Sequence, residues 1–256
     1  MARRPLLAGN WKMNGLTEDG LDLARRLAER ARTRRRLPFD LVLCPPFTLL
    51  APVRLEIDGT PLALGAQDCH PKDKGAHTGD VSAAMLADLG CRYVIVGHSE
   101  RRTGHAEANA LVRAKAEAAQ RAGLTAIICV GESEAERDRG HAASVVTAQL
   151  EGSVPPGASA ANTAIAYEPV WAIGSGRTPT LAEIREIHAL VRAELAVRFG
   201  DGEAPATRIL YGGSVKPANA KEILALADVD GALVGGASLV AADFWAIATS
   251  LPAAPR

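Results

Sequence analysis

Three features that mark other classes of protein are missing from this sequence. Its 29 basic and 29 acidic side chains give a formal charge of zero, so no field of one sign favours a polyanion. Its four cysteines form no C-x-x-C pair, and no apolar run is long enough for a signal peptide or a membrane span. We therefore expect a reduced, cytoplasmic protein that binds a small molecule rather than nucleic acid or a membrane.

The dinucleotide fingerprint G-x-G-x-x-G is also absent, which disfavours an open, doubly wound sheet. One unit recurs instead: a short apolar run, a loop of Gly, Pro and polar residues, and a helical stretch rich in Ala, Leu, Arg and Glu. Continuous apolar runs without alternation indicate parallel strands buried on both faces. The eight predicted strands are Leu6–Gly9, Leu41–Cys44, Leu62–Ala66, Tyr93–Gly97, Ala126–Val130, Thr163–Tyr167, Arg208–Tyr211 and Ala232–Val234.

Three amphipathic stretches predict the longest helices. They are Leu16–Arg32, Ala106–Ala122 and Leu181–Phe199, and Gly123 and Gly200 follow the last two as helix stops. The segment 152–160 has the composition of a domain linker, but the same rhythm continues beyond it, so we interpret it as a surface loop. Eight units in 256 residues predict a single α/β domain, residues 1–256, folded as a closed eight-stranded parallel (β/α)8 barrel.

In such a barrel the carboxyl ends of all strands meet at one face, which carries the active site. The residues that directly follow predicted strands are Asn10 and Lys12, His98 and Glu100, Glu168, Gly212-Gly213-Ser214, and Gly235-Gly236. They would supply a base, an electrophile, a cation and an anion cradle at one place.

Glu168 directly follows a predicted buried strand and precedes a segment that is stiff at Pro169 and glycine-rich at Gly174 and Gly176. A carboxylate beside a loop of this kind suits a base that is covered during turnover. Taken alone, the segment fits a helix-capping Glu almost as well, so the rest of the chain decides.

His98 precedes a predicted helix start, where the helix dipole would lower its pKa and favour a neutral imidazole. A lone His is more often structural, but His98 facing Glu168 would pair an electrophile with a proton acceptor. Lys12 could neutralise a phosphate, although most lysines only face solvent. The glycine turns after the seventh and eighth strands suit the usual phosphate site of this architecture.

Five motifs closely resemble the triosephosphate isomerase family, in the family's order and across nearly the whole chain. They are Ala8–Asn14, Val94–Arg102, Ala166–Gly174, Tyr211–Val215 and Gly235–Leu239. The resemblance implies a TIM barrel that interconverts dihydroxyacetone phosphate and D-glyceraldehyde 3-phosphate in glycolysis and gluconeogenesis, with no metal or organic cofactor.

The resemblance also implies the roles of single residues. Glu168 would move a proton between two carbons and His98 between two oxygens, while Asn10 and Lys12 hold the substrate and stabilise the enediolate. Glu100 would support Lys12. The positions that would contact phosphate are Gly174, in a mobile lid, and Ser214, Gly235 and Gly236.

Some positions depart from the family's usual residues. Ser175 and Arg177 stand in the lid where Thr and Lys are common, and His77 and Asp80 stand where an aromatic residue and Glu are common. The last two lie in the loop 67–81, which the resemblance assigns to a homodimer interface with Thr78 entering the partner's site. Cys129 ends a strand near Glu168, where we expect an inert packing thiol.

Other functions of a barrel fit less well. A Schiff-base aldolase would need a buried strand lysine, and Thr163–Tyr167 contains none. A metal-dependent epimerase would need ligands converging from several strands, and the six histidines show no such grouping. A binding scaffold without chemistry would have lost at least one of Asn10, Lys12, His98 and Glu168, and all four are present.

Overall fold

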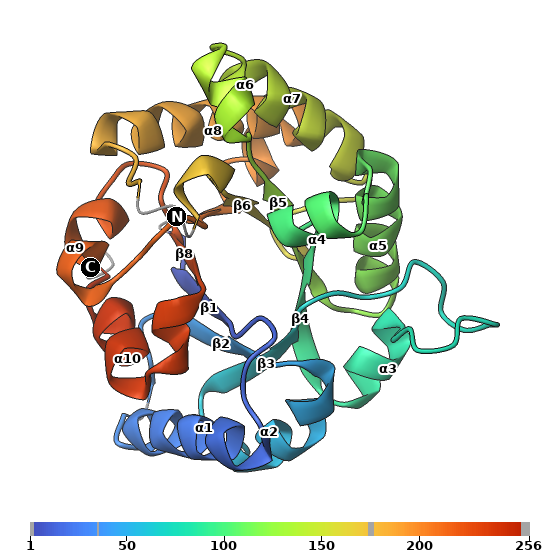
Figure 1. The fold of residues 1–256 in the computed structure, drawn as a ribbon, viewed down its shortest axis with the longest axis vertical. Helices are drawn as coiled ribbons and strands as arrows, with labels where there is room; N and C mark the ends of the chain where they lie inside the picture. The colour runs from blue at the N-terminus through green and yellow to red at the C-terminus, as the bar shows by residue number, and fades with distance from the viewer. Residues whose placement is uncertain (1–2, 35, 174–176, 252–256) are drawn as a thin grey trace.

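The computed structural model describes residues 3–34, 36–173 and 177–251. Within these residues, eight parallel strands pair in chain order and close into a barrel, because β1 pairs with β8 (Figure 1). The strands are β1 (Leu6–Asn10), β2 (Asp40–Cys44), β3 (Leu62–Ala66), β4 (Cys91–Val96), β5 (Thr125–Val130), β6 (Thr163–Tyr167), β7 (Arg208–Tyr211) and β8 (Gly231–Val234). Each overlaps a predicted strand, so the predicted barrel is confirmed.

Helices surround the barrel, one or two after each strand (Figure 1). The α-helices are α1 (Thr17–Arg32), α2 (Leu50–Glu56), α3 (Ala83–Asp88), α4 (Ser99–Gly104), α5 (Asn109–Arg121), α6 (Glu134–Asp138), α7 (Ala142–Ser153), α8 (Leu181–Glu203), α9 (Pro217–Leu224) and α10 (Ala241–Thr249). Short 3-10 helices are η1 (Phe47–Leu49), η2 (Val170–Ala172) and η3 (Gly236–Leu239). In the part of the chain described, every helix is too short or too polar to traverse a lipid bilayer.

The strands are buried on both faces, as their continuous apolar runs predict. Leu6 and Ala8 of β1 belong to a cluster made only of strand residues, which fills the barrel, whereas Leu7 belongs to the larger cluster between strands and helices. The filled interior is therefore a packed core, and open space for a ligand is confined to the ends of the strands.

Several boundaries differ from the predicted ones by one or two residues, and three differences concern helices and the loop 152–160. The helix expected from Ala106 begins at Asn109, because Ala106 has a φ of +52° and the Glu107 side chain turns inward to Arg101 and Lys115. The helix expected to end before Gly200 breaks there, at φ +71°, and then adds one more turn. The loop expected from residue 152 begins after Ser153, where α7 ends.

The amino ends of the strands are held by a charge cluster around Asp40, the first residue of β2. Asp40 accepts hydrogen bonds from Arg4 at 2.6 Å, from Arg208 at 2.9 Å and from the Tyr93 hydroxyl at 3.3 Å. These partners come from β4, β7 and the segment before β1, so the cluster ties the strands together across this end of the barrel.

Candidate active site

A cavity of about 550 Å³ opens at the carboxyl ends of the strands. Residues that follow β1, β4, β6, β7 and β8 form its walls. Of the predicted site residues, those lining it are Asn10, Lys12, His98, Glu168, Ser214, Gly235 and Gly236. The strand ends thus gather residues that are up to 226 positions apart in the sequence, from Asn10 to Gly236.

Glu168 and His98 are in direct contact within this cavity. The Nε2 atom of His98 lies 2.8 Å from Oε1 of Glu168, and the backbone N–H of Ser99 donates to Oε2 of Glu168 at 2.9 Å. Glu168 is 2% exposed and His98 is 6% exposed. The carboxylate therefore lies against the N-terminus of α4, between the His98 ring and the Ser99 N–H.

His98 has a defined proton arrangement. It caps the N-terminus of α4, where its Nδ1 accepts the backbone N–H of Glu100 at 3.2 Å, which leaves Nε2 to carry the proton toward Glu168. Burial disfavours the imidazolium, but the adjacent Glu168 carboxylate more than offsets this, and the pKa of His98 is raised. The predicted lowering of this pKa was wrong for this arrangement, because that prediction left out the direct contact with a carboxylate.

Lys12 is held over the cavity in a rare backbone conformation, with a φ of +53°. Its N–H donates to Oδ1 of Asn10 at 3.1 Å, its carbonyl accepts from Gln67 at 2.9 Å, and its ammonium lies 2.5 Å from Glu100. Gln67 also donates to the Cys44 carbonyl, which joins this turn to the end of β2. These contacts fix where the cation points.

Two glycine turns form one wall of the cavity, and the first of them lies beside Glu168. A Cβ at Gly212 would lie 2.8 Å from Cγ of Glu168, and one at Gly235 would lie 3.5 Å from Cε of Lys12. The side chain of Ser238 in η3 folds back onto the Gly235 carbonyl at 2.7 Å. The wall therefore presents backbone to the cavity, which is the arrangement that suits an anion.

The start of the segment after Glu168 is anchored by Glu132, which is fully buried. One oxygen of Glu132 accepts the Trp171 ring N–H at 2.8 Å and the Tyr167 hydroxyl at 3.1 Å. Arg137 lies 5.5 Å from the centre of the Trp171 ring. Arg177, one of the positions that depart from the family's usual residues, also lies here. It forms an ion pair with Glu134, and its guanidinium lies 5.1 Å from the centre of the Trp171 ring.

Cys129 is the second-to-last residue of β5, lies beside Glu168 and is completely buried. Burial raises its pKa well above the ordinary value, and the negative charge of Glu168 acts in the same direction. The thiol therefore stays protonated, as expected for a packing residue.

The remaining predicted residues lie outside the cavity wall. Glu100 is half exposed and touches the site through Lys12, and Thr78 is exposed in the segment that projects from the barrel between β3 and α3 (Figure 1). Gly174 and Ser175 fall outside the described residues. Sequence reasoning missed Gln67 and Glu132, each of which follows directly or closely on a strand end.

The cavity walls are better suited to an anion than to a metal ion. Among the described residues, the side chains spaced to hold a metal gather in the segment after β3 instead. The chemistry that the cavity offers is proton transfer by a carboxylate beside an imidazole, with an ammonium and backbone N–H groups for negative charge.

Comparison with known proteins agrees with this geometry. The family profile of triosephosphate isomerase matches residues 5–251. The chain is 61% identical to the triosephosphate isomerase of Afipia carboxidovorans over 97% of this chain and 98% of that protein, and 59% identical to that of Rhizobium etli over 95% and 94%. The crystal structure of triosephosphate isomerase from Bartonella henselae superposes with a TM-score of 0.89 at 49% identity, covering 96% of this chain and 98% of that one. The chain is therefore an isomerase and belongs to the triosephosphate isomerase family.

Proposed function

We propose that this chain interconverts dihydroxyacetone phosphate and D-glyceraldehyde 3-phosphate through an enediolate, with Glu168 as the base. The observation that carries the proposal is the direct contact of Glu168 with His98 in the wall of a cavity that also contains Lys12 and two glycine turns. No metal or organic cofactor takes part in the steps.

Glu168 takes a proton from the carbon next to the substrate carbonyl and returns it to the neighbouring carbon. The electron pair of the broken C–H bond becomes the C=C bond of the enediolate, and the π pair of the carbonyl moves onto its oxygen. After a proton has passed between the two oxygens, the other oxygen forms the new C=O bond, and the C=C pair takes the proton from Glu168 on the former carbonyl carbon. In the structure the Glu168 carboxylate accepts the Ser99 N–H and lies next to Nε2 of His98. Substrate binding therefore requires the carboxylate to swing from these donors into the cavity.

His98 moves the second proton, between the two oxygens. When Glu168 leaves Nε2, the contact that raises the pKa of His98 is lost, and burial then favours the neutral ring. A neutral ring with its proton on Nε2 donates a hydrogen bond to the developing oxyanion and can transfer that proton. Asn10 and Lys12 hold the same oxygens, and Glu100 positions the Lys12 ammonium.

The phosphate lies against the glycine turns in this proposal. Ser214, Gly235 and Gly236 line the cavity, where backbone N–H groups can reach the phosphate oxygens. We assign Gly174 to the same site, in a lid that closes over the substrate and excludes water. The anchoring of Trp171 by Glu132 supports a lid that hinges close to Glu168.

We further propose a homodimer that works in the cytoplasm and uses the loop 67–81 as its interface, with Thr78 entering the partner's site. The projection of this loop from the barrel and the exposure of Thr78 support the interface (Figure 1). Residues 1–256 make one domain, which is supported by the closure of the sheet between β1 and β8. The four buried free thiols fit a reducing compartment.

Glu168→Gln tests the assignment of the base. We expect kcat for the isomerisation of glyceraldehyde 3-phosphate to fall by roughly 10²-fold or more in a coupled assay, the scale of positioned proton transfer. The amide keeps the shape of the side chain, so phosphate affinity and the melting temperature should stay close to those of the unmodified protein.

The control is Glu151→Gln, the same change at an exposed position in α7, which should keep full activity. Both proteins are assayed with and without EDTA. A Glu168→Gln protein that retains most of its rate would show that another group is the base, and loss of the unmodified protein's activity in EDTA would favour a metal-dependent reaction.

A further inference from the structure

His70, His77 and Asp80 form a compact cluster in the segment between β3 and α3, outside the cavity. The segment is closed at its base, because the His70 N–H donates to the Val81 carbonyl at 2.8 Å and residues 70 and 82 form an isolated parallel bridge. His77 folds back toward that base through hydrogen bonds from its own N–H to Gly75 and from Asp80 to its carbonyl, at 3.0 and 3.1 Å. The backbone therefore brings the three side chains together before any ligand binds.

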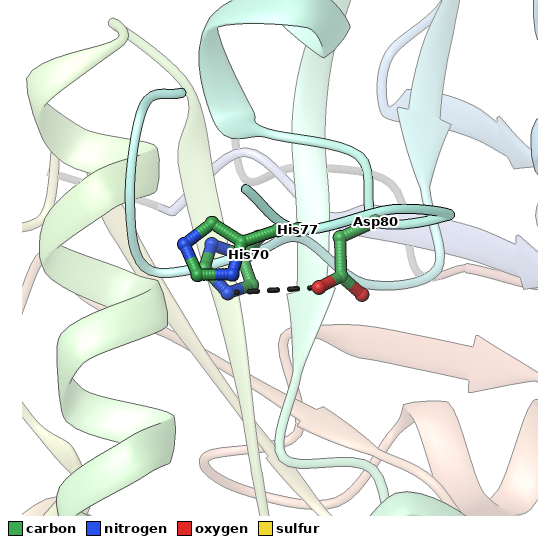
Figure 2. Close-up of side chains that lie close together, drawn as sticks. All are labelled: His70, His77 and Asp80. Carbon is green, nitrogen blue, oxygen red and sulfur yellow. Dashed lines mark ion pairs between the residues drawn. The ribbon is translucent and has the colours of Figure 1, made fainter. Parts of the chain in front are cut away.

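The ligand atoms of these side chains lie within 4.8 Å of one another. Figure 2 shows the His70 and His77 rings one above the other, with Asp80 beside them; the ring centres are 4.0 Å apart, and Nε2 of His70 lies 3.7 Å from Oδ2 of Asp80. Donor atoms around a tetrahedral Zn²⁺ lie about 3.3 Å apart, given Zn–N bonds of about 2.0 Å. Small side-chain rotations close this difference, and the half-exposed Asp80 has room to make them.

The donor set selects the class of ion. Two imidazoles and one carboxylate suit Zn²⁺ and its neighbours Ni²⁺ and Cu²⁺ rather than Ca²⁺ or Mg²⁺, which prefer oxygen ligands. A fourth position would hold water, as in open zinc sites. The adjacent Cys69 is buried, with its sulfur directed at the Lys115 carbonyl at 3.6 Å, so it lies outside this donor set.

One contact must change when the ion binds. The Lys72 N–H donates to Nδ1 of His70 at 3.1 Å, so in the empty site the ring proton is on Nε2. Coordination through Nε2 moves that proton to Nδ1, with no net loss of a proton from the neutral ring, and the Lys72 contact opens. The metal–nitrogen bond replaces a single hydrogen bond between neutral groups.

We propose that His70, His77 and Asp80 bind one divalent transition-metal ion, with Zn²⁺ as its representative, and that the ion staples the two limbs of the segment between β3 and α3. This site is separate from the cavity and does not depend on the isomerase mechanism. The segment is the one to which we assign the subunit interface, so metal binding would stiffen the interface loop.

Isothermal titration of the untagged full-length protein with ZnCl₂, after removal of metals with EDTA and dialysis, tests the site. At pH 7.5 we expect saturable binding of one Zn²⁺ per chain. His77→Phe and Asp80→Asn should each weaken binding by about tenfold or more, the scale that even indirect partners of a metal ligand reach.

His141→Phe provides the matched control, because it removes an exposed His in front of α7 and should leave the titration unchanged. Asp80→Asn keeps the shape of the side chain, so it decides the outcome if His77→Phe does not fold. The absence of saturable binding at pH 7.5, or unchanged affinity in a folded Asp80→Asn or His77→Phe protein, would overturn the proposal.

Discussion

At the scale of single residues, the surroundings of a His decide its pKa, and the pKa values of two histidines here are shifted in opposite directions. The pKa of His98 is raised because Glu168 lies against it. His188 of α8 is completely buried, with Nδ1 2.9 Å from the Asp228 carbonyl, and burial lowers its pKa to about 4 although that carbonyl favours the charged ring. His188 is therefore a neutral donor that joins α8 to the turn before β8.

The low pKa of His188 predicts a pH dependence of stability. Well above pH 6.5 the ring is neutral in both folded and unfolded chains, so it contributes no slope there. Between pH 6.5 and about 4 the unfolded chain binds a proton at this site and the folded chain does not. The free energy of unfolding should therefore fall as the pH falls through this window, by roughly 3 kcal/mol from this one group.

Urea unfolding at pH 7.5, 6.5, 5.5 and 4.5, at one protein concentration, measures this slope. In His188→Gln the pH-dependent contribution of this ring to the free energy of unfolding should disappear. The variant should therefore lose less stability between pH 6.5 and 4.5 than the unmodified protein does. Parallel curves for the two proteins would contradict the assignment.

At the scale of elements, the chemistry depends on how each loop is attached to its strand. The loop after β6 begins with Glu168 and is tied to the loop after β5 through the Trp171–Glu132 hydrogen bond. The turn after β1 is tied to the start of the loop after β3 through Gln67. Contacts between loops thus hold the segment that begins with Glu168 and the turn that carries Lys12.

Trp171→Phe should loosen the attachment of the proposed lid. It removes the ring N–H that Glu132 accepts in a fully buried place, and a hydrogen bond to a charged group is worth about 2 kcal/mol. We expect a loss of this size in the free energy of unfolding and a lower kcat/KM, measured by urea unfolding and the coupled assay.

Trp245→Phe makes the same chemical change in α10, away from this loop. It should leave kcat/KM close to that of the unmodified protein. Equal kcat/KM values for Trp171→Phe and Trp245→Phe would show that the hydrogen bond to Glu132 does not contribute to the function of the proposed lid.

The sequence predicts the strands well and the contacts between loops poorly. The bounds of β3, β6 and β7 agree with prediction because a buried parallel strand has a distinctive apolar run. The start of α5 was misplaced because Ala106 favours helices, whereas the buried Glu107 ion pairs override that preference. Glu132 and the His70–His77–Asp80 cluster were missed, since only the folded loops bring their partners together.

At the scale of the whole molecule, four exposed apolar side chains belong to the part of the barrel that carries the proposed interface. Met13 and Leu16 follow β1, Phe47 follows β2 and Met85 lies in α3, and Met13 is 96% exposed. These residues belong to the first three consecutive units of the barrel, and the projecting loop 67–81 is part of the third (Figure 1). Apolar surface of this kind next to a protruding loop is typical of a site that another protein covers, and a second copy of the chain is the partner we propose.

Thr78→Arg should disrupt the homodimer, because the proposed interface would have to bury a charge without a partner. We expect light scattering after size exclusion to give a mass near that of one 26.8 kDa chain for the variant and near twice that mass for the unmodified protein. Val197→Arg, the same kind of change at an exposed position in α8, should remain dimeric. A Thr78→Arg protein that keeps the double mass at micromolar concentration would place the interface elsewhere.

The charge cluster around Asp40 and the filled barrel above it affect how molecules enter and leave. In the part of the chain that the structure describes, side chains pack the barrel beneath the cavity, and the far mouth is held by Arg4, Arg208 and Tyr93. Substrate and product therefore enter and leave through the same end of the barrel, at the carboxyl ends of the strands. If they are the proposed ketose and aldose, the two compete for one cavity, and the product must leave before the next substrate molecule can bind.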